Sequence, residues 1–90
     1  MKELSSILGK NIYAQLRLRC RGWIQVSIKD DECIITIKFN ELEYTEMYDR
    51  LAERILQGEF VSVKIVDGFI RRWRKYAITQ MEKKMFYEEP

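Results

Sequence analysis

Apolar and polar side chains alternate along much of the first half of the chain. Ile12, Ala14, Leu16 and Leu18 alternate with polar or basic residues, and the alternation resumes after Gly22. A further alternating run covers 33–39. Period-two alternation is typical of strands with one buried face. The pattern therefore predicts strands at about 11–20, 23–29 and 33–39, arranged as a three-stranded antiparallel meander with one apolar face.

The phase of the alternation predicts how these strands pair. Partners across an antiparallel ladder point to the same face, so Leu18 should face Ile24. That register leaves Cys20-Arg21-Gly22 as a three-residue loop, with the glycine in the left-handed position. The same test leaves Asp30-Asp31 as the next turn. It pairs Cys33 with Ile28, Ile35 with Val26, Ile37 with Ile24 and Lys29 with Glu32.

The next segment changes to a helical period. Residues 42–57, LEYTEMYDRLAERILQ, predict a helix that ends near Gly58 and covers the apolar face of the meander. Its apolar stripe consists of Tyr44, Met47, Tyr48, Leu51, Ile55 and Leu56. Residues 1–9 predict a short helical segment at the N-terminus, docked or frayed.

The last third of the chain admits two interpretations. Residues 60–66 alternate as in a strand, and Asp67-Gly68 is a hairpin signal. A possible capping box at 79–82 favours a fresh helix. We therefore expect strands at about 60–66 and 69–78 and a helix at about 80–88, although one long helix over 69–86 fits the apolar spacing nearly as well. The expected fold is α+β, with residues 1–90 forming a single small globular domain.

Composition and charge narrow the class of protein. The chain has 90 residues and a net charge of only +2, from 16 basic and 14 acidic side chains. Such a total does not mark a nucleic-acid binder, so any basic site must come from the distribution of charge. Two cysteines are too few for a disulfide scaffold, and no run approaches the roughly 20 apolar residues of a membrane span. We expect a cytoplasmic protein that does not associate with membranes.

The inventory of reactive side chains argues against an enzyme. The chain contains no histidine, which removes the commonest general base and the usual partner of a nucleophile. The two cysteines lack metal-ligand spacing, and the isolated glycines form no phosphate cradle. Asp30, Asp31 and Glu32 form an acidic cluster, which a hairpin turn explains more simply than a cation site. We expect no catalytic residues, no metal and no cofactor.

One basic surface is expected on the polar face of the meander. The predicted registers place Arg19, Trp23 and Lys38 in one row, with Arg17 in the next. Cations beside an aromatic ring suit binding of phosphates and stacking of bases. A solvated strand face with a cation–π pair is the simpler explanation of the same residues.

A second basic patch is the sequence RRWRK, which comprises Arg71, Arg72, Trp73, Arg74 and Lys75. Four cations in five positions with flanking aromatic residues suit phosphate contact. Protection of an edge strand from aggregation is the structural alternative, although it usually needs fewer charges.

Two function classes follow from these patterns. The first is a small non-enzymatic, nucleic-acid-binding accessory protein that uses the basic, aromatic sheet face and the 71–75 patch. The alternative is a protein-interaction or regulatory module, such as a homodimer, of bacterial or phage type and without a nucleic-acid role. Its basis is the near-neutral charge and the exposed aromatic and apolar side chains.

Overall fold

The computed structural model describes residues 2–58 and 61–87 and has an α+β fold. The elements follow in the order α1 (Lys2–Arg19), β1 (Trp23–Lys29), β2 (Glu32–Phe39), β3 (Leu42–Tyr48), α2 (Leu51–Leu56) and α3 (Val61–Tyr87). None of the helices in these ranges combines the length and the apolar character that a membrane span requires.

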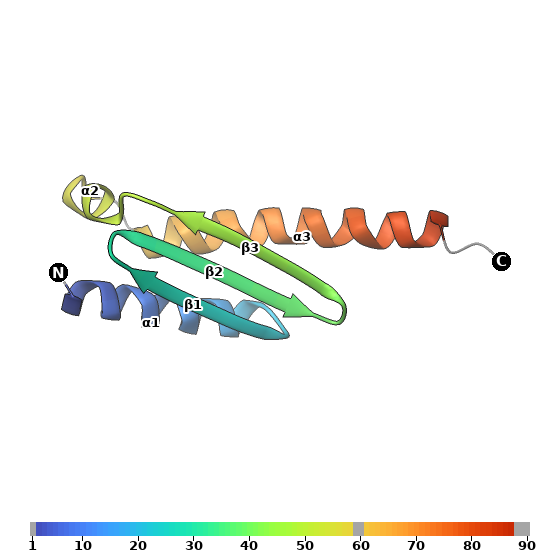
Figure 1. The fold of residues 1–90 in the computed structure, drawn as a ribbon, viewed down its shortest axis with the longest axis horizontal. Coiled ribbons are helices and arrows are strands. Elements are labelled where there is room, and N and C mark those ends of the chain that lie inside the picture. Colours follow the sequence, from blue (N-terminus) through green and yellow to red (C-terminus); the bar gives the residue numbers. More distant parts are fainter. Residues whose placement is uncertain (1, 59–60, 88–90) are drawn as a thin grey trace.

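The three strands form an antiparallel sheet in the order β1-β2-β3, and α1 and α3 cover the same face of it (Figure 1). We call this covered face the inner face. Along β2, Cys33, Ile35 and Ile37 are completely buried on it, whereas the residues between them point to the uncovered outer face. α1 packs against β1 and against α3, and α3 also contacts β3. The C-terminal part of α3 continues past the end of the sheet (Figure 1).

The predicted hairpin of residues 23–39 is confirmed in every pair. Ile24 faces Ile37, Val26 faces Ile35, Ile28 faces Cys33 and Lys29 faces Glu32. Asp30 adopts a φ of 58°, in the left-handed region that Asp tolerates better than most residues. The predicted two-residue turn at Asp30-Asp31 is therefore also correct.

The predicted strand at 11–20 is wrong, because residues 11–19 belong to α1. The expected short helix at 1–9 is instead the beginning of this longer helix, although residue 1 lies outside the described residues. Ile12 and Leu16 are buried four residues apart, which is helical spacing, whereas Leu18 is 87% exposed. Ile12 and Leu16 fit the two-residue period of a strand as well as the period of a helix. Packing of α1 on the sheet selects the helix.

The predicted helix at 42–57 is also wrong over its first half. Leu42–Tyr48 forms β3, which takes the place beside β2 that 11–20 was expected to hold. Met47, expected in the helical stripe, is exposed on the outer face, because Tyr44, Glu46 and Tyr48 face inward at a spacing of two. Only the short helix α2 remains of the prediction, and it contacts α3 rather than covering the sheet.

The predicted strands at 60–66 and 69–78 are replaced by α3, so the single-helix interpretation is correct for 69–86. Residue 60 lies outside the described residues, as does residue 88 of the helix expected at 80–88. Ile65, Val66, Phe69, Ile70 and Trp73 are buried at helical spacing. Their packing against the sheet and α1 overrides the low helix propensity of the β-branched run at the start of α3.

The loop from α1 to β1 has the predicted length, but it joins a helix to a strand. Gly22 adopts a φ of 104°, and a Cβ atom at this position would lie 2.4 Å from the carbonyl oxygen of Lys38. The glycine therefore permits both the backbone conformation and a close approach to the end of β2.

Replacing Gly22 by alanine should lower the free energy of unfolding by more than the same change at Gly58. Gly58 also has a positive φ, of 75°, but no atom lies within 4 Å of a Cβ added there. Gly58→Ala should therefore cost only the conformational strain, about 1–2 kcal/mol, whereas Gly22→Ala adds a steric clash. Urea unfolding of both variants measures the difference, and equal costs would show that the contact with β2 is unimportant.

Candidate functional site

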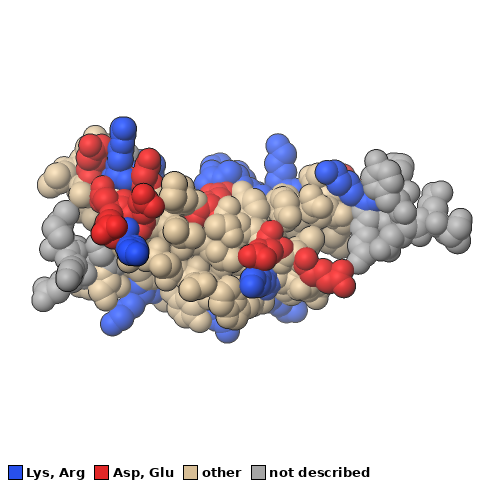
Figure 2. Space-filling model, viewed as in Figure 1, with Lys and Arg blue, Asp and Glu red and all other residues tan. Residues whose placement is uncertain are grey.

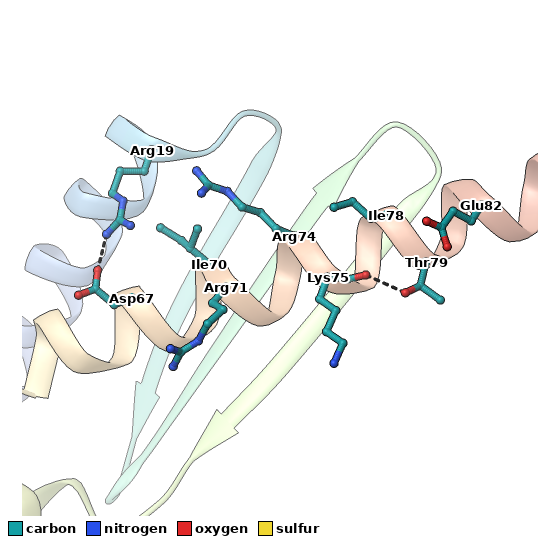
Figure 3. A pocket seen from close by; sticks show the side chains of 9 residues that line it. All are labelled: Arg19, Asp67, Ile70, Arg71, Arg74, Lys75, Ile78, Thr79 and Glu82. Carbon is teal, nitrogen blue, oxygen red and sulfur yellow. Dashed lines mark hydrogen bonds and ion pairs between the residues drawn. The ribbon is translucent and has the colours of Figure 1, made fainter.

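An open groove of about 480 Å³ lies between the C-terminal end of α1 and the middle of α3. Figure 3 shows the side chains that line it: Arg19, Asp67, Ile70, Arg71, Arg74, Lys75, Ile78, Thr79 and Glu82. Four of them are cations and two are carboxylates. We call this feature the basic groove.

Three of its cations come from one face of α3. Arg71, Arg74 and Lys75 are three and four residues apart, the spacing that places side chains side by side on a helix. In Figure 3, Arg74 points toward the end of α1 and the loop after it, whereas Arg71 and Lys75 point to the other side of the groove. All three are exposed, and no acidic partner is found for them among the described residues. Their charges are thus available to an anionic ligand.

The fourth cation, Arg19, is held at one end of the groove. Its guanidinium forms an ion pair with Asp67 of α3, with 2.6 Å between Nη1 and Oδ1 (Figure 3). Both side chains are roughly half exposed, so the pair contributes little to stability, about 0–1 kcal/mol. Its effect is to bring the end of α1 next to Arg74 and to neutralise one of the two carboxylates.

Cys20 lies beside these cations. Burial raises the pKa of its thiol, and the charges of Arg74 and Arg19 oppose that shift. The loop after α1 is therefore within electrostatic reach of the basic groove. Both cysteines are free thiols, and Cys33, which is buried as expected, has its pKa raised to about 11 by desolvation.

Arg72 is directed away from the groove and has a structural role. Its Nε and Nη2 each donate a hydrogen bond of 2.8 Å to the carboxylate of Glu46 on β3. Glu46 faces inward and also accepts hydrogen bonds from the hydroxyls of Tyr44 and Tyr48. This network joins α3 to the edge strand, and it explains how a carboxylate is tolerated on the inner face of the sheet.

The ionisation of this network follows from its contacts. Burial alone would raise the pKa of Glu46, but the hydrogen bonds from Arg72, Tyr44 and Tyr48 and the charge of Arg72 outweigh it, and the pKa is lowered. Desolvation, with the hydrogen bond to Glu46, raises the pKa of Tyr44 to about 12. Desolvation and Glu46 also raise the pKa of Tyr48. The carboxylate is therefore held charged and the two hydroxyls neutral.

Trp73 belongs to the core rather than to a binding surface. It is only 8% exposed, and its ring lies 6.0 Å from the ring of Tyr44 and 6.2 Å from that of Tyr76, between centroids. Phe69 extends the same aromatic cluster, with its ring 5.5 Å from that of Tyr44. Within RRWRK, the central aromatic residue anchors α3 to the sheet and the flanking cations point elsewhere.

The outer face of the sheet carries fewer cations than expected. The predicted pairing of Trp23 with Lys38 is confirmed, and the Lys38 ammonium lies 5.0 Å from the centroid of the Trp23 ring. Arg17 and Arg19 are absent from this face because they belong to α1, and Arg17 donates a hydrogen bond of 3.0 Å to the carbonyl of Gly22. Glu43 flanks Lys38 instead. Figure 2 shows a largely uncharged surface over the middle of the strands, with acidic side chains toward both ends of the sheet and most Lys and Arg along the margins.

The nine predicted site residues therefore separate into three groups. Arg19, Arg71, Arg74 and Lys75 meet at the basic groove; Trp23 and Lys38 form a pair on the outer face; and Arg17, Arg72 and Trp73 make structural contacts. The sequence reasoning missed the other five residues of the groove, which are Asp67, Ile70, Ile78, Thr79 and Glu82. Their helical spacing from Arg71 and Arg74 is the signal that a single-helix interpretation of 69–86 would have used.

The acidic turn at Asp30-Asp31 has a structural role, because Asp31 forms hydrogen bonds to the start of α2. The carboxylate of Asp31 accepts a hydrogen bond of 2.7 Å from the backbone N–H of Ala52, and its carbonyl accepts one of 3.3 Å from that of Leu51. Asp31 thus satisfies amide groups at the start of α2. Within residues 2–58 and 61–87, no group of three acidic or cysteine side chains is arranged to hold a metal ion.

Comparison of the chain with protein-family models, with curated proteins and with solved structures gives no match. The basic groove and the outer face are therefore interpreted from their own chemistry.

The Glu46–Arg72 network should make stability depend on acid pH. Because the folded state lowers the pKa of Glu46 below its ordinary value of 4.5, the unfolded chain takes up this proton more readily. The stabilisation is thus complete above pH 4.5 and is lost as the pH falls through the lower, folded-state pKa. Glu46→Gln should cost on the order of 1 kcal/mol at neutral pH, since solvent reaches Arg72 and screens the pair.

Urea unfolding at a series of pH values measures this effect. The stability difference between the natural chain and Glu46→Gln should shrink as the solution is acidified below pH 4.5. Glu43→Gln is the matched control, because Glu43 lies on the same strand but is exposed on the outer face. A Glu46→Gln effect no larger than that of Glu43→Gln would contradict a stabilising role for the network.

Proposed function

We propose that this chain is a non-enzymatic binding protein that holds the phosphates of nucleic acid in the basic groove. The observation that carries the proposal is the gathering of Arg71, Arg74 and Lys75 with Arg19 around one open groove. Arg71, Arg74 and Lys75 have no acidic partner among the described residues, unlike Arg19, and such cations neutralise phosphates and release their counterions. The lack of histidine in the sequence favours binding over acid–base catalysis.

A polymer fits this groove better than a small anion does. The cations line both sides of an open groove rather than converging on one enclosed point (Figure 3). Ile70 and Ile78 provide apolar surface between them, suited to the sugars of a nucleic-acid backbone. The small net charge of the chain is compatible with local binding, because phosphate contacts respond to charges within about 10 Å at moderate salt.

Binding should be weakened by salt and by reversal of the groove charges. The double variant Arg71→Glu/Arg74→Glu should abolish measurable binding to oligonucleotides at low salt, because it replaces attraction by repulsion at the phosphates. For the natural chain, the logarithm of the binding constant should fall with the logarithm of salt concentration by about 0.7–0.9 for each phosphate neutralised. Fluorescence anisotropy with labelled single strands and duplexes provides the measurement.

The matched control is Lys10→Glu/Lys29→Glu, which changes the net charge by the same amount outside the groove. Lys10 is exposed on α1 and Lys29 is exposed at the far end of β1. This control should retain most of the binding. Equal losses in both double variants would mean that only total charge matters, and the absence of binding to DNA or RNA at low salt would reject the proposal.

A protein partner is the second candidate, and a separate observation favours it. Ile78 and Met81, in the C-terminal half of α3, are 57% and 61% exposed. Exposed apolar side chains on a projecting helix are suited to packing against another helix, including one from a second copy.

This alternative predicts self-association that depends on Met81. Sedimentation velocity over a wide range of protein concentration should show growth beyond the monomer, and Met81→Ser should reduce it. Met81 does not line the basic groove, so the variant should leave nucleic-acid binding intact. Ile34→Ser, at an exposed apolar residue on the outer face, is the control. This candidate would be excluded if the chain stayed monomeric at every concentration and bound no other protein.

A further inference from the structure

Trp23 presents an aromatic surface close to the basic groove. It is the first residue of β1, points to the outer face of the sheet and is 50% exposed. The Lys38 ammonium lies over its ring, 5.0 Å from the centroid. This contact helps to fix the orientation of the indole and leaves half of its surface open to solvent. A large exposed ring beside a cation is a stacking platform for a nucleic-acid base.

A short loop connects the platform to the groove. Only Cys20, Arg21 and Gly22 separate Arg19 from Trp23, so the two Cα atoms are at most about 14 Å apart. The loop is held at both ends: the backbone N–H of Cys20 donates a hydrogen bond of 2.8 Å to the carbonyl of Leu16, and Arg17 donates one of 3.0 Å to the carbonyl of Gly22.

Cations continue along this connection. Arg21 is exposed in the middle of the loop that joins Arg19 to Trp23. A phosphate backbone that followed this loop from the groove would pass Arg21 before it reached Lys38. This order places one of its bases within reach of the Trp23 ring. Gln25 is exposed in the next row of the outer face, where its side-chain amide is able to donate a hydrogen bond to a base edge.

The arrangement favours a single strand over a duplex. Bases of a duplex are stacked on one another, and separating them costs a few kcal/mol per step. Bases of a single strand are free to stack on an aromatic side chain. Trp23 provides one flat ring on an open sheet face, so it suits a base that is already exposed.

We infer that the ligand of the basic groove is single-stranded nucleic acid and that Trp23 stacks on one of its bases. The inference rests on the proposed function, because the groove cations supply the phosphate contacts. It adds a second contact point on the opposite side of the loop, and it assigns Trp23 and Lys38 to binding although they lie outside the groove.

Titration with a short oligothymidine, with a duplex of the same length as comparison, tests this inference. Stacking should quench the fluorescence of Trp23, whereas Trp73 is buried among aromatic rings and should not respond. Trp23→Ala should weaken single-strand binding about 5- to 150-fold, the range expected for one stacked base. Trp23→Phe should retain part of the affinity. Met47→Ala, at an exposed residue on the same face but in a different row, is the control and should have little effect.

The results separate this inference from the proposed function. If Trp23→Ala and Met47→Ala bind the single strand equally, or if the duplex binds more tightly, the stacking inference is overturned. Sensitivity to Arg71→Glu/Arg74→Glu would persist in that case, and the groove would remain a phosphate site. If neither oligonucleotide binds the natural chain at low salt, both proposals fail together.

Discussion

Burial of the inner face of β2 is the constraint on which the rest of this structure depends. Cys33, Ile35 and Ile37 are fully buried in the middle of a three-stranded sheet, and such a sheet needs a cover on its apolar face. α1 and α3 provide that cover, and each is positioned by a stripe of buried side chains at helical spacing. No helix covers the outer face among the described residues, so the protein presents two different surfaces: a helical side with the basic groove and an open sheet side.

The orientation of α3 on the sheet determines what each residue of RRWRK does. Trp73 must point into the core, and Arg72 then reaches Glu46 at the edge of β3. Arg74 then points toward the end of α1, and Arg71 and Lys75 lie exposed on the other side of the basic groove. The basic groove is therefore a consequence of core packing combined with an uneven distribution of charge. The same packing takes two of the five residues out of any binding role.

Sequence reasoning found the charged and aromatic candidates but grouped them incorrectly. Arg17 and Arg19 appeared to share a strand face with Trp23, because Ile12, Ala14, Leu16 and Leu18 fit a period of two as well as Ile12 and Leu16 fit a helix. The third strand was missed because Glu46 interrupts its inward-facing pattern. A carboxylate is stable at that position only because Arg72, Tyr44 and Tyr48 satisfy it, and those contacts join residues distant in sequence.

The sequence by itself determined the α+β class and the hairpin of β1 and β2, including its turn and every cross-strand pair. It could do so because alternation and turn chemistry agree within one short segment. Only the tertiary structure decided whether 11–20, 42–48 and 61–78 are helices or strands. The apolar positions of each segment are compatible with the two-residue period of a strand and with the period of a helix. Their state depends on which segments complete the sheet and which cover it. That choice also decided which cations meet at the groove, because a helix and a strand project the same arginines in different directions.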